Sequence, residues 1–159
     1  MNLMDVIAKA KAEKATSLDL SQQDLRILPK ELFDIESLEE LNLDRNKLVE
    51  IPDEIAKLKN LKSLSVSEND LMELPDTIGN LTKLEHLYLG YNSLSELPAT
   101  VGKLVNLRTV NIAKNQLLDL PAEIGNWKKV VKLSLHDRCF YAEMTVRRSA
   151  AYSQLYGLA

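Results

Sequence analysis

The stretch LEHLYLGYNSLSELP, residues 84–98, decides the fold because its plan recurs every 23 residues. Three of its positions define columns along the chain, namely Leu38, Leu61, Leu84, Leu107 and Val130; Pro29, Pro52, Pro75, Pro98 and Pro121; and Asn46, Asn69, Asn92 and Asn115, with Gln23 one period earlier. The shared pattern is L-x-x-L-x-L-x-x-N-x-L-x-x-(L/I)-P-x-x-(I/V)-x-x-L-x-x. An internal repeat of this length indicates a solenoid.

Within each repeat, the residue chemistry predicts a strand, a turn and a short helical segment. The alternation in L-x-L has a period of two, which indicates a strand with one buried face. An asparagine amide can donate and accept hydrogen bonds at a tight turn, and proline then ends the strand. Proline also suits a first helical turn, and the apolar residues three and six positions later are expected to face inward.

This pattern resembles that of the leucine-rich repeat family. The resemblance implies an α/β solenoid with a parallel sheet on the concave face, short helical turns on the convex face, and helical caps. It divides the chain into an N-terminal capping helix at 1–14, repeats at 15–139 (five full and one partial), and a C-terminal capping segment at 140–159.

The L-P-x-x-I-x-x-L form of the repeat resembles that of Ras-associated and plant Ras-group intracellular proteins and of many bacterial proteins. The opening IAKAKAEKATSLDLSQQDLRILP, residues 7–29, resembles the start of bacterial and Roco-type leucine-rich repeat proteins. Roco proteins carry a GTPase domain after the repeats, but this chain has no G-x-x-x-x-G-K-[ST] motif. The resemblance therefore implies a binding module without GTPase activity.

Composition narrows the class of protein further. The net charge of −3 argues against a nucleic-acid binder, which usually shows a basic face. The single cysteine, Cys139, excludes an intrachain disulfide framework and suits a reducing compartment. With no secretory signal and no apolar run long enough to span a membrane, we expect a cytoplasmic protein without membrane contact.

The reactive side chains do not form a catalytic or metal-binding set. His86 and His136 are the only histidines, and they fall two repeats apart, too far to share a metal ion. Cys139 follows His136 closely, but we interpret it as a small buried residue. We therefore expect no enzyme activity, no cofactor and no small-molecule substrate. Trp127 shares a core column, whereas Phe33 shares none, and we expect Phe33 to be a surface or edge contact.

The strand residues between the buried leucines are expected to face the concave side, where one repeat differs from the others. The fourth repeat places His86, Tyr88 and Tyr91 beside small Gly90 and Ala113, which predicts a shallow hollow next to the rings. Exposed tyrosines on a rigid sheet are typical binding hot spots, although aromatic residues also pack across strands for stability alone. The predicted partner-binding residues are His86, Tyr88, Tyr91, Asn111, Lys114, Arg45, Asn42 and Arg108.

The sequence thus favours a non-enzymatic module that binds another protein through its concave face, as an adaptor, scaffold or inhibitor in signalling. We expect it to be monomeric. Two alternatives stay open: a structural, self-assembling repeat protein, because a solenoid can stack through exposed ends, and a non-catalytic recognition subunit of an enzyme complex.

Overall fold

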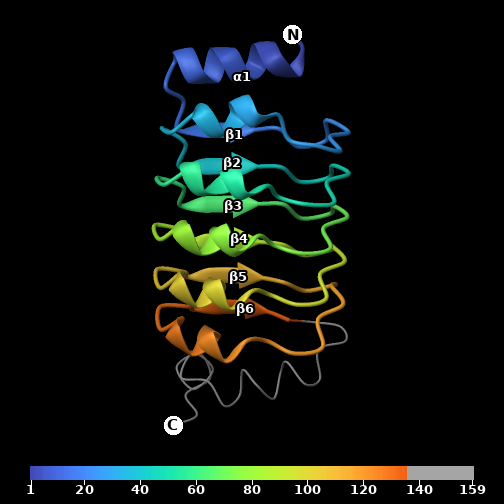
Figure 1. The fold of residues 1–159 in the computed structure, drawn as a ribbon, viewed down its shortest axis with the longest axis vertical. Helices are drawn as coiled ribbons and strands as arrows, with labels where there is room; N and C mark the ends of the chain where they lie inside the picture. The colour runs from blue at the N-terminus through green and yellow to red at the C-terminus, as the bar shows by residue number, and fades with distance from the viewer. Residues whose placement is uncertain (136–159) are drawn as a thin grey trace.

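A computed structural model describes residues 1–135 of the chain (Figure 1). These residues form one N-terminal helix, six strands in a single parallel sheet, and five 3₁₀ helices. The helix is α1 (Leu3–Ala12); the strands are β1 (Ser17–Asp19), β2 (Glu40–Asn42), β3 (Ser63–Ser65), β4 (His86–Tyr88), β5 (Thr109–Asn111) and β6 (Lys132–Ser134); the 3₁₀ helices are η1 (Lys30–Asp34), η2 (Asp53–Lys57), η3 (Asp76–Asn80), η4 (Ala99–Lys103) and η5 (Ala122–Asn126).

The strands stack in sequence order, and their register follows the repeat. Leu41 of β2 lies between Leu18 and Leu64, each one repeat away in sequence, and every neighbouring pair of strands keeps this register. The repeat columns read from the sequence are therefore spatial columns. Each of the five full turns of the chain, called coils below, contributes one strand to the sheet and one 3₁₀ helix to the opposite side, as the sequence predicts (Figure 1).

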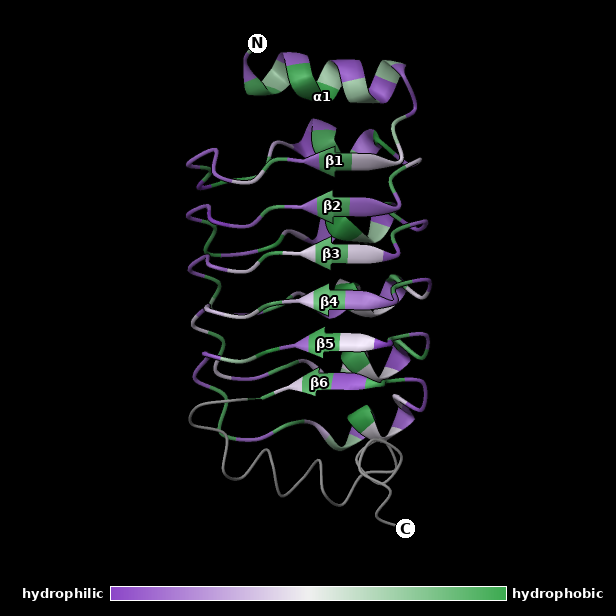
Figure 2. Ribbon diagram, turned by 180° about the vertical axis from the view of Figure 1, so that it is seen from behind, coloured by the Kyte–Doolittle hydropathy of each residue, from purple (hydrophilic) through white to green (hydrophobic). Residues whose placement is uncertain are grey.

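The core lies between the sheet and the 3₁₀ helices. The central residue of each strand, a leucine or, in β5, Val110, points into it, and Figure 2 shows this alternation of hydrophobic and hydrophilic residues along the strands. Each 3₁₀ helix follows a proline, and the apolar residues three and six positions after that proline are buried, as predicted. Trp127, in the second of these columns, is fully buried and donates its indole N–H to the carbonyl of Val101 at 2.8 Å.

The asparagine column forms a buried ladder along the turn that follows the strands. Asn92 accepts a hydrogen bond from the backbone N–H of Leu71, at 3.0 Å, and donates to the carbonyl of Val66, at 2.8 Å, both in the preceding coil. Its amide also donates to Leu89 in its own coil. Asn46, Asn69 and Asn115 repeat this arrangement. The ladder satisfies backbone groups that the buried turn would otherwise leave unpaired.

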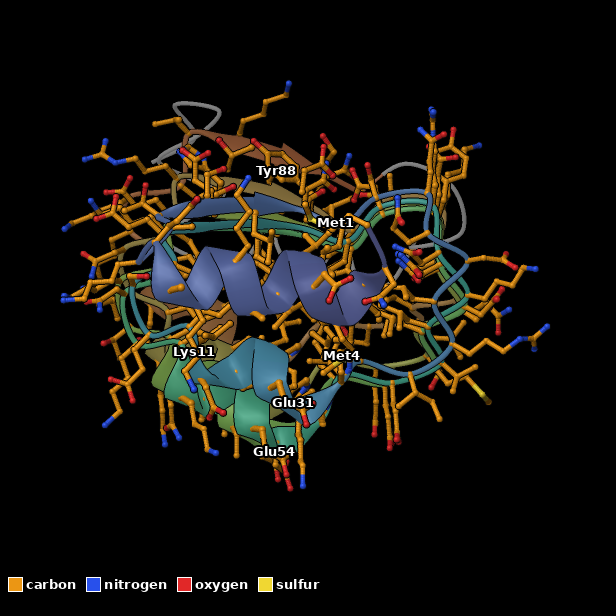
Figure 3. The ribbon with its side chains drawn as sticks, turned by 90° about the horizontal axis from the view of Figure 1, so that it is seen from above. Met1, Met4, Lys11, Glu31, Glu54 and Tyr88 are labelled. Carbon is orange, nitrogen blue, oxygen red and sulfur yellow. The ribbon has the colours of Figure 1, made fainter. Side chains whose placement is uncertain are left out.

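The helix α1 lies across the first coil, as the view down the stack shows (Figure 3). It begins with a capping box, in which Asn2 and Asp5 each accept a hydrogen bond from the other's backbone N–H. Ile7 and Ala10 are its buried residues and belong to the same core cluster as the repeats. Its capping role stays a prediction, and the predicted C-terminal segment 140–159 lies outside the described residues. Within residues 1–135, the structure contains no helix that could span a membrane.

Phe33 corrects one expectation, because it is 1% exposed and belongs to the core. Its column holds small residues in later coils, including Gly79 and Gly102. A Cβ atom at Gly79 would lie 2.6 Å from the carbonyl oxygen of Thr100 in the next coil, so this column points between coils. A large side chain there is enclosed rather than exposed, and the repeat pattern did not reveal this because it leaves the position blank.

Candidate functional site

The predicted partner-binding residues lie in three kinds of place: on the strands, just after the end of a strand, and just before a strand. Asn42, His86, Tyr88 and Asn111 belong to strands β2, β4, β4 and β5 and lie in the columns that alternate with the buried leucines. We call the side of the sheet that these columns form the sheet face. Arg45, Tyr91 and Lys114 follow the ends of three strands, and Arg108 directly precedes β5. Figure 3 shows Tyr88 on the sheet side and Glu31 and Glu54 on the opposite side.

His86 and Tyr88 form the one aromatic pair found among the described residues. Residues two apart in a strand point to the same face, and here the ring centroids are 6.4 Å apart with the ring planes 7° from parallel. Both side chains are half-buried. The Nδ1 atom of His86 is buried without a hydrogen-bond partner in residues 1–135, which leaves Nε2 as the ring nitrogen available to a partner. The pair offers a flat, partly apolar surface in the middle of the sheet.

Tyr91 stands apart from this pair. It is 59% exposed, and its φ of 58° places its backbone in the left-handed region. The same position in the other coils also has positive φ, at Gln22, Arg45, Glu68 and Lys114. The backbone N–H of Tyr91 still donates to Ala113 of the next coil, at 3.0 Å, so the unusual dihedral belongs to a regular turn. Tyr91 therefore adds a large exposed ring at the margin of the sheet face.

Three other predicted residues have structural roles that the sequence reasoning missed. The side-chain oxygen of Asn42 accepts from the N–H of Asp44 at 2.9 Å, and that of Asn111 accepts from Ala113 at 3.0 Å. Such contacts two residues ahead are Asx turns, and the short N-L-D and N-I-A sequences are the available signal for them. Arg45 donates through Nε to both carboxylate oxygens of Glu68, at 3.2 Å each. These atoms are already engaged in the free protein.

The prediction of a shallow hollow beside Gly90 is wrong. A Cβ atom on Gly90 would lie 3.1 Å from Oδ1 of Asn111, so the asparagine amide of the next coil occupies that space. The surface next to the rings is thus polar and filled. The residues that remain as the centre of a candidate surface are His86, Tyr88 and, at the margin, Tyr91.

One carboxylate on the sheet face has a shifted pKa. Hydrogen bonds from the side chain and the backbone N–H of Ser21 lower the pKa of Asp19, because they stabilise the charged form. This face carries Asp19 in the first coil and Glu40 and Asp44 in the second, in contrast to the aromatic fourth coil.

The described residues hold no group of three His, Cys, Asp or Glu side chains that could bind a metal ion. His136 and Cys139 lie outside the described residues, so the interpretation of Cys139 as a buried structural residue stays a prediction. A surface groove lies away from the predicted site, at the edge formed by Glu73, Leu74, Pro75, Asp76, Glu96 and Pro98. Its acidic lining includes none of the residues predicted from the sequence.

Comparison with protein families gives two overlapping matches. A model described as "Leucine-rich repeat region" matches residues 16–92, and one described as "Leucine Rich repeats (2 copies)" matches residues 82–126. No curated protein sequence gives a match to the chain. The more specific resemblance to Roco-type and Ras-group proteins stays a prediction.

Solved structures with a similar fold include two plant receptors. The leucine-rich repeat ectodomain of the Arabidopsis thaliana membrane receptor kinase GASSHO1/SCHENGEN3, in complex with CASPARIAN STRIP INTEGRITY FACTOR 2, is 36% identical with a TM-score of 0.67; the match covers 76% of this chain and 15% of the receptor chain. The plant peptide hormone receptor RGFR1, in complex with RGF2, is 37% identical with a TM-score of 0.63, and the match covers 76% and 24%.

A bacterial structure shares the fold alone. An internalin from Listeria monocytogenes is 19% identical with a TM-score of 0.68, and the match covers 87% of this chain and 38% of the internalin. The chain thus spans well under half the length of each of these proteins.

Proposed function

The chain is a leucine-rich repeat protein, and we propose that it binds a protein or peptide partner through the sheet face of its fourth coil, without catalysing a reaction. Leucine-rich repeats typically serve as interaction modules, and two of the similar structures are receptors solved with ligands, one of them described as a peptide hormone receptor. In this proposal the chain acts as an adaptor, scaffold or inhibitor.

The observation that carries the proposal is the pair formed by His86 and Tyr88. The two rings lie nearly parallel and half-exposed on a sheet whose backbone register is fixed by its neighbours on both sides. Aromatic side chains held in one orientation lose little entropy when they bind, so they contribute strongly to affinity. Tyr91 adds exposed aromatic area in the same coil.

The extent of the sheet face fits a single partner of modest size. Six strands, each with a few outward residues, give a surface comparable with one side of a standard protein interface. We propose that the protein acts as a monomer in the cytoplasm; its single cysteine permits no intrachain disulfide, which suits a reducing compartment. Light scattering tests the monomer, and larger species would favour the self-assembling alternative.

A peptide-library selection tests the proposed site. Peptides are selected on the wild-type protein and their affinities are then measured on Tyr88→Ala/Tyr91→Ala. We expect a loss of more than about 2 kcal/mol, or about 30-fold, if these tyrosines are hot spots. Met72→Ala is the matched control, because Met72 is 65% exposed but lies outside the strands, between β3 and η3. Circular dichroism confirms that each variant is folded.

The outcomes separate the alternatives. Peptides that lose affinity for the tyrosine variant but not for Met72→Ala support the proposed site. Peptides that bind all three proteins equally overturn it and place binding elsewhere on the chain. A selection that yields no binder also counts against peptide recognition by this face.

A further inference from the structure

One backbone N–H beside the aromatic pair lacks the acceptor that its counterparts have. In the coils around it, the residue two positions after the strand receives a hydrogen bond on its N–H from a side-chain oxygen of the sheet face. The bonds are Ser21 N–H to Asp19, 2.9 Å; Asp44 N–H to Asn42, 2.9 Å; Ser67 N–H to Asp44, 2.8 Å; and Ala113 N–H to Asn111, 3.0 Å. These N–H groups therefore point toward the sheet face.

Gly90 holds this position in the fourth coil, and its N–H has no acceptor in residues 1–135. The reason is that two residues differ from their counterparts in the other coils. Tyr88 stands where Asp19, Asn42 and Asn111 supply an oxygen from their own coil, and its phenol cannot fold back on Gly90. Ser67 stands where Asp44 supplies an oxygen from the preceding coil, and its shorter side chain makes no such bond.

The surroundings of this N–H suit an incoming oxygen. Tyr88, stacked with His86, stands two residues before it on the same coil. On the other side, Oδ1 of Asn111 is committed to Ala113, while its amide N–H₂ group has no acceptor among the described residues. Gly90 adds no side chain of its own, but it is buried and Oδ1 of Asn111 lies beside it, so the group that reaches its N–H must be small, such as an oxygen atom. An unpaired backbone donor is costly when it is covered, so an acceptor that reaches it gains free energy.

We propose that Gly90 N–H is a docking point for a carbonyl or carboxylate oxygen of a peptide that lies over Tyr88. This proposal rests on the proposed function and deepens it, because it names the group that the partner contributes. The apolar face of the ring pair holds the adjoining side chain or backbone, and the N–H fixes the register of the peptide. The fourth coil then differs from its neighbours in two linked ways. It carries the rings of His86 and Tyr88 on the sheet face, and the N–H of Gly90 has no acceptor within residues 1–135.

Position 67 allows a test that leaves both rings intact. Ser67→Asn and Ser67→Asp place a side-chain oxygen where Asp44 places one for the preceding coil, so they are designed to cap the Gly90 N–H from within the protein. Ser67→Ala is the matched control, since it changes the same residue without adding an acceptor. Selected peptides are expected to bind Ser67→Asn and Ser67→Asp about tenfold more weakly and Ser67→Ala as wild type, the effect of one hydrogen bond.

Nuclear magnetic resonance gives a readout that does not depend on selected peptides. Acetate, which offers a carboxylate, and N-acetylglycinamide, which offers neutral carbonyls, are titrated against the wild type while the Gly90 amide signal is followed. We expect a downfield shift of the Gly90 amide proton in the wild type and in Ser67→Ala, and little shift in Ser67→Asn. A response to acetate alone identifies a carboxylate as the partner group; a response to both identifies any carbonyl oxygen.

Each contrary result has a distinct meaning. A Gly90 signal that neither probe moves, or that moves equally in Ser67→Asn, overturns the docking point. If peptides meanwhile depend on Tyr88 and Tyr91, the proposed function stands and only this deeper inference fails. If no peptide depends on the tyrosines but the probes shift Gly90, the donor is accessible and the proposed function is the part that fails.

Discussion

Asn92→Ala tests whether the asparagine ladder stabilises the fold mainly by supplying an acceptor to one buried backbone N–H, that of Leu71. The side chain of Asn92 takes part in four hydrogen bonds: it accepts from Leu71 N–H, at 3.0 Å, and donates to the carbonyls of Val66, Leu89 and Gly90, at 2.8, 3.0 and 3.4 Å. Removing the side chain breaks all four, but the broken partners are not equally affected.

The three carbonyls keep other donors after the substitution. Val66 still accepts from Asn69 at 3.3 Å, Leu89 from Asn115 at 2.9 Å, and Gly90 from the N–H of Glu68 at 2.9 Å. Only the N–H of Leu71, a fully buried residue, loses its one acceptor. An orphaned buried donor costs about 2 kcal/mol and the lost favourable bonds about 1 kcal/mol more. We therefore expect the free energy of unfolding to fall by about 3 kcal/mol.

Urea denaturation followed by circular dichroism measures this loss. Asn80→Ala is the control, because Asn80 is exposed in η3 and should cost less than about 0.5 kcal/mol. Asn92→Asp sharpens the comparison: it keeps an acceptor for Leu71 but turns an anionic oxygen toward three carbonyls, so it should be at least as destabilised as the alanine variant near neutral pH. A loss at Asn92→Ala as small as that of the control would refute the reasoning.

Three further predictions concern packing and charge. Gly102→Ala should lower the free energy of unfolding by about 1–3 kcal/mol, because its Cβ would lie 2.8 Å from a backbone oxygen of the next coil. Gly125→Ala is the control, because its Cβ would meet no described atom within 4 Å, and it should change the free energy of unfolding by less than about 0.5 kcal/mol. Equal losses of stability for the two variants in urea denaturation would contradict this reasoning. Phe33→Ala should cost about 3–5 kcal/mol in the same assay, and a cost below about 1 kcal/mol would return Phe33 to the surface. The lowered pKa of Asp19 means that its carboxylate contributes stability above its unfolded pKa, about 3.9, and that this contribution disappears as the pH falls through the folded value; Asp19→Asn should therefore lose less stability on acidification than the wild type, and equal losses would exclude the role of the Ser21 hydrogen bonds.

The parts of the fold that repeat were predictable from the sequence. Each column is supported by several coils, so Leu41, Asn92 and Trp127 take their places with little ambiguity. Exceptions within a column were harder to interpret. Phe33 has no large counterpart in other coils, and its enclosure depends on the spacing between adjacent coils, which the consensus does not describe.

The sequence predicted which face of the sheet the candidate residues share, but not the hydrogen bonds that their side chains make. The sequence placed His86 and Tyr88 on one face, because residues two apart in a strand must share it. It did not reveal that Asn42 and Arg45 already bond within the protein, since each uses a partner set by turn geometry or by the neighbouring coil. It also overestimated the space beside Gly90, because side chains from the next coil cross over the column.

The direction of the asparagine ladder has a consequence for the order in which the chain becomes structured during synthesis. Each Asn completes the turn of the preceding coil, so the N–H of Leu71 obtains its acceptor only when a residue 21 positions later has been made. At about 5–20 residues per second, that interval is about 1–4 s. From the first coil to the fourth, the newest coil emerging from a ribosome therefore still lacks one asparagine, and this unfinished turn moves along the chain as Asn46, Asn69, Asn92 and Asn115 are made.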